Sequence, residues 1–262
     1  MTSLLRRYGW LLLTLLSTSL QAQTLWEGAS RQRLAAIFAD GLHHQPDAAA
    51  DVAALSAPFL GVPYRAHTLI GSKHTPERLV VDLQGMDCFT FLDYVEALHR
   101  SHSERDFLPA LVATRYSEGR LDFRHRRHFF SDWFARAPVN ALDITQSLSP
   151  AAQTVVKRLN AKPGPPGAEY LPGLGIVTRH ISYIPASAID AALLAKLQNG
   201  DYIGIYAPSL GLDITHAGIF LRTTAGPMLR NASSRSSYRR VMDTPFLDYV
   251  KHTPGIVVLR PL

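Results

Sequence analysis

The sequence contains one cysteine in 262 residues, so the chain has no internal disulfide. Charged residues are few, at 18%, and hydrophobic residues reach 47%, which is ordinary for a globular protein and excludes extensive disorder. The net charge is +6, and the sequence contains no Lys/Arg block of the kind that marks a nucleic-acid arm, so we expect no nucleic-acid partner. The apolar stretch near the N-terminus is too short to span a bilayer comfortably, and the sequence has no internal repeat.

That N-terminal stretch has the layout of a secretory signal peptide. Arg6 and Arg7 form a basic segment, residues 10–16 form an apolar segment, and Ala22 ends the expected cleavage site. We therefore expect a signal peptide over residues 1–22, a mature chain over residues 23–262, a periplasmic location and no stable membrane anchor after cleavage. A retained anchor is the alternative, and the bulky Leu20 leaves the cut site open. No cysteine follows the apolar segment, which excludes a lipoprotein anchor.

The single cysteine, Cys88, stands where a nucleophile is expected. Asp87 is a good N-cap, and the apolar spacing of Phe91, Val95 and Leu98 predicts a helix that begins at Cys88. A thiol in the first helical turn lies near the positive end of the dipole and near unpaired N–H groups, which favour the thiolate. The alternative is a buried cysteine that packs as a small hydrophobic residue. In an exported chain, an unpaired cysteine is also a candidate reactive thiol.

Partners for Cys88 are predicted in the second half of the chain. His216 lies in a predicted strand, and Asn231 lies in the next one; a turn within residues 223–227 makes them a hairpin that brings Asn231 close to the position across from His216. An amide there can fix the tautomer of the imidazole. The alternatives are a hydrogen-bonded core or surface histidine and an asparagine at a strand end.

The remaining pattern predicts an α+β chain, with a helix-rich and a strand-rich lobe in one domain. The Pro/Gly-rich loop 161–175 separates the two lobes. Helices are predicted over residues 31–38, 51–59, 107–114, 151–159, 188–197 and 245–250. Strands are predicted over residues 78–83, 175–184, 202–206, 215–221, 228–232 and 256–259, mostly in an antiparallel sheet.

Four segments together resemble the NlpC-type papain-like cell-wall hydrolases: DCFTF at 87–91, GDYI at 200–203, HAGIF at 216–220 and NAS at 231–233. LGVPY at 60–64 resembles the segment of that superfamily whose tyrosine lies beside the active site. LVVDL at 79–83, FSDW at 130–133, GLD at 211–213 and GIVV at 255–258 resemble the N-acetylmuramyl-L-alanine amidase-like branch. The resemblance implies a papain-like fold, in which a helical N-terminal lobe with the catalytic cysteine at a helix N-terminus packs on an antiparallel sheet.

The resemblance also implies a cysteine amidase that cuts the amide between N-acetylmuramic acid and L-Ala in peptidoglycan or muropeptides. Cys88 is then the nucleophile, His216 the base and Asn231 the orienting residue. One alternative is a stem-peptide endopeptidase that cuts the D-Glu–diamino acid bond with the same triad. Another is a non-catalytic module that binds cell-wall fragments.

Further residues are candidates for substrate contacts. Tyr64 is expected to donate its phenol to the oxyanion, and Arg115 is expected to bind a stem carboxylate. Ser131 and Trp133 belong to a basic and aromatic segment, residues 124–133, that offers cations for carboxylates and rings for a sugar. The alternative for each is a structural role in the core or on a solvated face.

We expect no metal and no cofactor. The histidine pairs His43–His44 and His125–His128 lack companion ligands at zinc spacing. The expected partner is the peptidoglycan or muropeptide substrate, and the expected state is a monomer.

Overall fold

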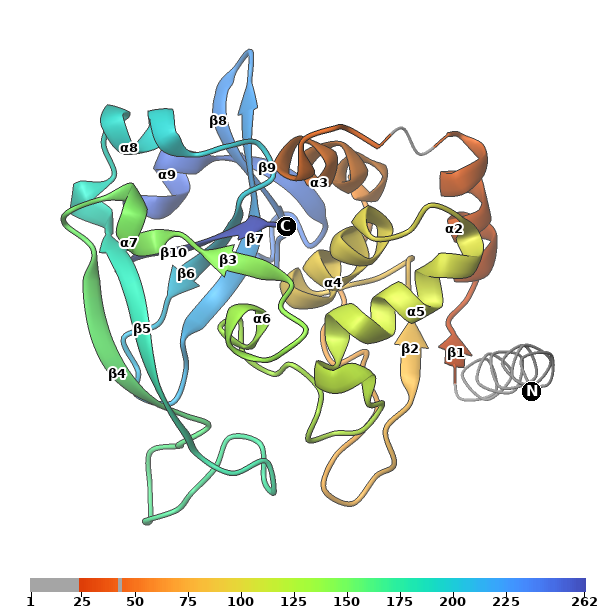
Figure 1. The fold of residues 1–262 in the computed structure, drawn as a ribbon, viewed down its shortest axis with the longest axis horizontal. Helices are drawn as coiled ribbons and strands as arrows, with labels where there is room; N and C mark the ends of the chain where they lie inside the picture. Colours follow the sequence, from red (N-terminus) through yellow and green to blue (C-terminus); the bar gives the residue numbers. More distant parts are fainter. Residues whose placement is uncertain (1–23, 42–43) are drawn as a thin grey trace, which may run out of the picture.

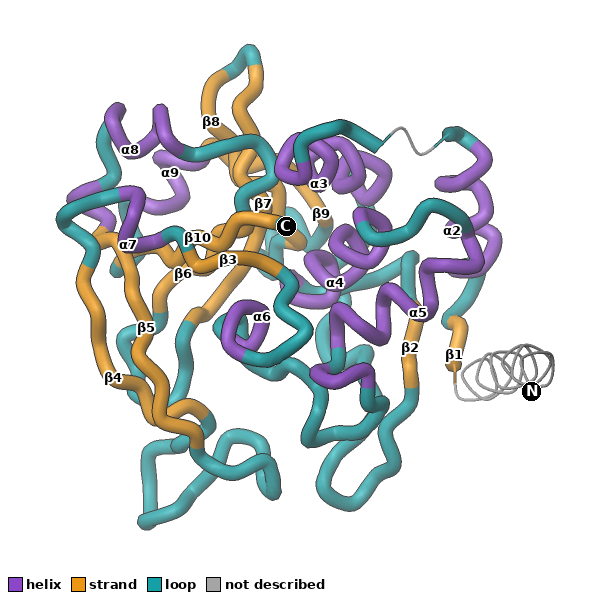
Figure 2. The backbone as a smooth tube through the Cα atoms, viewed as in Figure 1, coloured by secondary structure: helices purple, strands orange, loops and turns teal. Residues whose placement is uncertain are grey.

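The structure, a computed structural model, describes residues 24–41 and 44–262, and its course is drawn in Figure 1. The predicted signal peptide, residues 1–22, and His43 lie outside the described residues. Helices and an antiparallel sheet make up the described chain, which confirms the predicted α+β class (Figure 2). Within the described ranges, no helix has both the length and the apolar character that a membrane crossing requires.

The main sheet has eight strands. Seven follow the order β4-β5-β10-β6-β7-β8-β9, and β3 also pairs with β10. Its pairings are antiparallel. The strands are β3 (Ala141–Asp143), β4 (Gln153–Leu159), β5 (Val177–Pro185), β6 (Tyr202–Tyr206), β7 (Ile214–Thr223), β8 (Gly226–Ala232), β9 (Val241–Pro245) and β10 (Gly255–Pro261). A separate parallel pair, β1 (Thr24–Trp26) and β2 (Leu79–Val81), leads into the loop before Cys88.

The helices lie on the two sides of this sheet. Figure 1 shows α2, α3, α4 and α5 on one side and α7, α8 and α9 on the other. The α-helices are α2 (Ser30–Ala39), α3 (Ala48–Ser56), α4 (Cys88–His99), α5 (Glu104–Arg115), α6 (Asp132–Ala135), α7 (Thr145–Leu148), α8 (Ala191–Lys196) and α9 (Phe246–Val250). Short 3₁₀ turns cover Ala57–Phe59, Ser117–Gly119 and Ala186–Ala188.

Helix α4 is the central element of the helical side. It packs against α3, α5 and β7, and every residue from Thr90 to Leu98 is buried. The alternation of β7 sends Ala217, Ile219 and Leu221 into the core shared with α4, whereas Phe220 enters a second core beside α9. The buried face of α4 therefore fixes the position of its N-terminus, where Cys88 lies, against one end of β7.

Three predicted elements need correction. The helix expected at 151–159 is wrong, because residues 153–159 form β4 and pair along their whole length with β5. The β-branched run Thr154-Val155-Val156 favours that extended state. The helix predicted over residues 245–250 starts one residue later, at Phe246, because residues 241–245 form strand β9, which was not predicted. The helix predicted over residues 188–197 is shorter in the structure, since α8 is capped by Asp190 and spans Ala191–Lys196.

Candidate active site

Asp87 fixes the helix that carries Cys88. Its backbone is extended, and its carboxylate accepts the N–H groups of Phe89 at 3.1 Å and of Thr90 at 2.8 Å. The Thr90 hydroxyl accepts the Asp87 N–H at 3.0 Å, which completes a capping box. The prediction that Asp87 caps a helix beginning at Cys88 is confirmed.

The protonation state of Cys88 differs from the expectation. Burial raises the pKa of Cys88 to about 12, and the charge of Asp87 adds to this increase. The backbone N–H groups of Ala217, Cys88 and Phe89 act in the opposite direction but do not outweigh it. The N–H groups of the helix terminus favour the thiolate as expected, but burial and the Asp87 charge outweigh them in the free protein. The raised pKa favours a neutral thiol, and part of the residue surface of Cys88 is open to solvent.

His216 of β7 and Asn231 of β8 are hydrogen-bonded neighbours. His216 Nε2 lies 3.0 Å from Asn231 Oδ1. The Asn231 amide nitrogen donates to the Leu229 carbonyl at 3.1 Å and to the Thr244 hydroxyl at 3.3 Å, so the amide oxygen is the atom that faces the ring. His216 Nε2 therefore carries the proton, and Nδ1 is left as the acceptor.

The surroundings of His216 favour its neutral ring. Burial lowers the pKa of His216, the hydrogen bond with Asn231 raises it, and the charge of Arg235 lowers it again, for a net decrease. The strand is irregular at this point: Ile205 pairs with His216 and Tyr206 with Ile214, so the register skips one residue of β7. Such a bulge redirects side chains next to it.

Two tyrosines flank the thiol. The Tyr249 ring of α9 stacks on the His216 ring with centroids 5.8 Å apart. Burial raises the pKa of Tyr249, the charge of Arg235 lowers it and Cys88 raises it, so Tyr249 lies within electrostatic range of the thiol. Burial likewise raises the pKa of Tyr64, followed by the effects of Cys88 and Asp87. The structure thus brings Cys88, His216, Asn231 and Tyr64 into one region.

Tyr64 reaches this region through backbone pairing. Its N–H donates to the Arg239 carbonyl at 2.8 Å, and the Met86 N–H donates to the Pro63 carbonyl at 3.2 Å. The Tyr64 segment therefore lies between the loop that leads to Cys88 and the segment that follows β8. This pairing holds parts of the chain that are far apart in sequence at one site.

Sequence reasoning missed three residues at this site: Tyr249, Arg235 and Arg239. The two arginines lie in the exposed segment after β8. The guanidinium carbon of Arg235 is 4.9 Å from the Tyr249 ring centroid, and that of Arg239 is 5.4 Å from the Tyr64 centroid. The basic text SRSSYRR at 234–240, directly after the NAS segment, was the available signal.

Arg115 does not fit its predicted role. Only 1% of its side chain is exposed, and its Nε donates to Asp93 Oδ2 at 2.7 Å. Its Nη1 donates to the Val80 carbonyl at 2.7 Å, and its guanidinium lies over the Tyr94 ring. Arg115 therefore joins α5, α4 and β2 in the core and offers no surface to a substrate.

Ser131 and Trp133 are also structural. Ser131 is 1% exposed; its N–H donates to Asp213 Oδ2 at 2.7 Å, and its hydroxyl accepts from Arg179 at 2.7 Å. Trp133 is fully buried, edge-on to Tyr202 at 5.0 Å and tilted against Phe89 at 6.0 Å. Both side chains are internal, and Trp133 packs against Phe89 in the first turn of α4.

The segment 124–133 as a whole is mostly internal. Arg126 pairs with Glu77 at 2.5 Å, and Arg127 donates to the carbonyls of Ala113 and Thr114. Arg124 has an exposed surface. The expectation that this segment supplies several cations and rings to a substrate is therefore wrong, because folding uses most of them.

Comparison with solved structures finds neighbours of similar fold that are named an amidase, a protein of the DUF1460 family and a putative xylanase. A crystal structure of an N-acetylmuramoyl-L-alanine amidase from Bacteroides uniformis is 28% identical, with a TM-score of 0.66, and the match covers 82% of this chain and 99% of that chain. A Legionella pneumophila protein of the DUF1460 family has the same fold at 21% identity, with a TM-score of 0.72 over 94% of this chain and 97% of that chain. No curated protein sequence matches this chain.

Comparison with protein families gives a match over most of the chain. Residues 54–256, which include Tyr64, Cys88, His216 and Asn231, match the AmiA-like family. The family is described as N-acetylmuramoyl-L-alanine amidase-like. The chain belongs to this amidase-like family of cell-wall hydrolases.

Proposed function

We propose that this protein is a papain-like cysteine amidase of the NlpC type, which hydrolyses peptidoglycan or muropeptides between N-acetylmuramic acid and L-Ala. The observation that carries the proposal is the position of Cys88 at the capped start of α4, where the backbone N–H of Ala217, the residue after His216, reaches the thiol. His216 is hydrogen-bonded to Asn231. A thiol, an imidazole and a group that orients the imidazole are the parts of a cysteine-hydrolase triad. The amidase-like family supports the choice of reaction.

The proposed reaction starts from a neutral pair, because burial raises the pKa of Cys88 to about 12 and lowers that of His216. As sulfur bonds to the scissile carbonyl carbon, the thiol proton passes to His216 Nδ1 and the carbonyl electrons move to oxygen. The C–N bond then breaks, and the amine leaves with the proton from Nδ1. Water hydrolyses the thioester by the same route, releases the lactyl carboxylate and returns the proton to sulfur.

The first turn of α4 supplies a donor for the oxyanion. The Asp87 carboxylate occupies the N–H groups of Phe89 and Thr90, and its carbonyl accepts the Phe91 N–H at 3.0 Å. The Cys88 N–H is the remaining donor of this turn, and it points toward the sulfur of the same residue. We assign the oxyanion to this N–H, with the Tyr64 hydroxyl as a second donor.

We further propose that residues 1–22 direct export to the periplasm and that residues 23–262 then act as one domain. Support for a single domain comes from the main hydrophobic core, which contains Leu34 of α2, Phe91 of α4 and Leu259 of β10. Support for export comes from the sequence pattern alone.

The decisive experiment is incubation with defined muropeptides followed by product identification by mass. The expected products are the free sugar with its lactyl carboxylate and an intact peptide that begins with L-Ala. Cys88→Ala, which removes one sulfur atom, is the matched control and should lose at least ~10³-fold activity with an unchanged Tm. Retained turnover in the folded variant would eliminate the covalent mechanism.

A second measurement separates an enzyme from a binding module. Cys88 is the only cysteine of the chain, so an electrophilic thiol probe reports on this residue without ambiguity. An amidase should react in a pH-dependent way and be protected by a muropeptide. A binding module with an inert buried thiol should show neither effect.

A further inference from the structure

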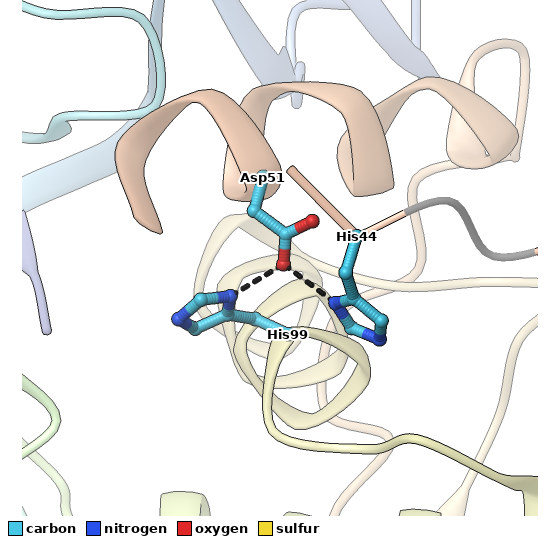
Figure 3. Close-up of side chains that lie close together, drawn as sticks. All are labelled: His44, Asp51 and His99. Atoms are coloured by element: carbon cyan, nitrogen blue, oxygen red, sulfur yellow. Dashed lines mark hydrogen bonds and ion pairs between the residues drawn. The ribbon is translucent and has the colours of Figure 1, made fainter. Parts of the chain in front are cut away.

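A cluster of two histidines and one carboxylate lies away from the candidate active site (Figure 3). Asp51 Oδ2 of α3 is 2.9 Å from His44 Nδ1 and 2.6 Å from His99 Nδ1. The Asp51 side chain is 1% exposed, and those of His44 and His99 are 25% and 14% exposed. Sequence reasoning found no companion ligand for His44, because His99 follows only after 54 intervening residues and α4 brings it back.

The outer nitrogens of both rings determine their tautomers. His44 Nε2 is 2.8 Å from the Ser101 carbonyl, and His99 Nε2 is 3.1 Å from the Leu262 carbonyl oxygen. Because these oxygens only accept, each Nε2 must carry a proton. A neutral imidazole then has its lone pair on Nδ1. Two such lone pairs converge on one carboxylate oxygen, and this arrangement requires positive charge between them.

A divalent metal ion satisfies this arrangement. Histidines that bind metals donate their other ring N–H to a carbonyl or carboxylate, as His44 and His99 do. The other oxygen of the carboxylate, Asp51 Oδ1, accepts the Gln45 N–H at 2.7 Å, which holds the group in place. Two imidazoles and one carboxylate suit zinc, whereas calcium and magnesium prefer oxygen ligands.

We propose that His44, Asp51 and His99 bind one zinc ion, with water in the fourth position. Zinc bonds of ~2.0–2.2 Å place ligand atoms about 3.3 Å apart, so Asp51 Oδ2 must move away from each imidazole nitrogen by less than 1 Å, which side-chain rotation supplies. His44 leaves a quarter of its side chain exposed, which admits the water. The alternative occupant is a pair of protons, one on each Nδ1, which donate to Asp51 Oδ2 in place of the ion.

The location assigns the ion a structural role. Cys88 and His99 are the first and last residues of α4, which separates them by roughly 16 Å along the helix. The ion joins the segment before α3 to the end of α4, and the outer hydrogen bond of His99 extends the network to the last residue of the chain. Binding only the folded state stabilises it in proportion to the logarithm of zinc concentration.

The test uses the purified mature protein, stripped of metal with a chelator and then titrated with Zn²⁺ alone. The expected result is one zinc per chain by mass spectrometry of metals, with the Tm raised by about 5–10 °C at zinc a hundred times above Kd. His99→Ala and Asp51→Asn should each weaken zinc binding more than the 10- to 100-fold typical of losing an outer partner. Co²⁺ substitution gives an absorption readout that needs no hydrolysis.

Two matched variants control for other zinc ligands. The His102 ring lies edge-on to His44, with centroids 5.1 Å apart, outside the cluster; His102→Ala should therefore retain binding. Cys88→Ala should also retain it, because the competing thiol is at the other end of α4. Loss of zinc in Cys88→Ala, or no stoichiometric binding by the wild-type chain, overturns the proposal. If His99→Ala does not fold, the wild-type stoichiometry and Asp51→Asn still decide.

Discussion

Asn231 is expected to act on catalysis only through the orientation and pKa of His216. Asn231→Ala removes the 3.0 Å hydrogen bond to Nε2. A hydrogen bond to a charged group contributes about 1.5–3 kcal/mol, and His216 is charged only after it takes the thiol proton. At 1.36 kcal/mol per tenfold, the expected loss in kcat/KM is about 10- to 100-fold. His216→Ala removes the proton carrier itself and should lose at least ~10³-fold.

The pH profile of kcat/KM tests the role of Asn231 independently of the size of the activity loss. The hydrogen bond with Asn231 raises the pKa of His216 against the larger effect of burial. The base must be neutral, so activity falls as pH drops through this pKa. Asn231→Ala should move the acidic limb of kcat/KM to lower pH, and Asn231→Asp, which adds a negative charge, should move it to higher pH.

The assay is muropeptide hydrolysis measured by mass across pH, with Tm recorded for every variant. Thr244→Val is the matched control, because it removes only the hydroxyl that holds the Asn231 amide nitrogen and leaves the contact with His216. It should cost less than about 3-fold. The assignment is refuted if Asn231→Ala loses more activity than His216→Ala in folded protein. It is also refuted if the acidic limbs of Asn231→Ala and Asn231→Asp shift in the same direction.

Three further outcomes are expected. Burial raises the pKa of Cys88 to about 12, so the rate of thiol alkylation in the free protein should increase continuously from pH 6 to pH 10. A plateau in this rate at neutral pH would instead indicate a resting thiolate–imidazolium pair. Arg115→Ala should lower the free energy of unfolding, measured by urea denaturation, by about 3–5 kcal/mol, since it leaves Asp93 buried and unpaired. Substitution of the exposed Arg124 by alanine should change it by no more than about 0.5 kcal/mol. Equal effects of the two variants would contradict the structural role of Arg115. Muropeptide products should contain no sugar that still carries L-Ala-D-Glu, because that species would establish the endopeptidase.

Local patterns predicted the elements that depend on neighbours in sequence. The start of α4 follows from Asp87 and from the spacing of apolar residues behind Cys88, both of which act within a few residues. The hairpin that joins His216 to Asn231 follows from strand alternation and a short turn. The motif text indicated the amidase-like family before any geometry was known.

Prediction failed where burial and distant partners decide. Nothing local to Arg115 shows that folding encloses its side chain, so a substrate role remained open. Residues 153–159 adopt a strand because β5, which lies beyond the Pro/Gly loop, pairs with them throughout. The thiol pKa was predicted from the helix terminus alone, whereas burial and the Asp87 charge dominate it.

The sequence by itself determined the α+β class, the helix that begins at Cys88, the likeness to amidases and the candidates Cys88, His216 and Asn231. These depend on residue types and short spacings, which a linear text contains. Only the tertiary structure decided which groups surround the thiol, which arginines are enclosed, and that His44, Asp51 and His99 meet. Such contacts join residues dozens of positions apart, and their energies depend on burial, which exists only once the chain has packed.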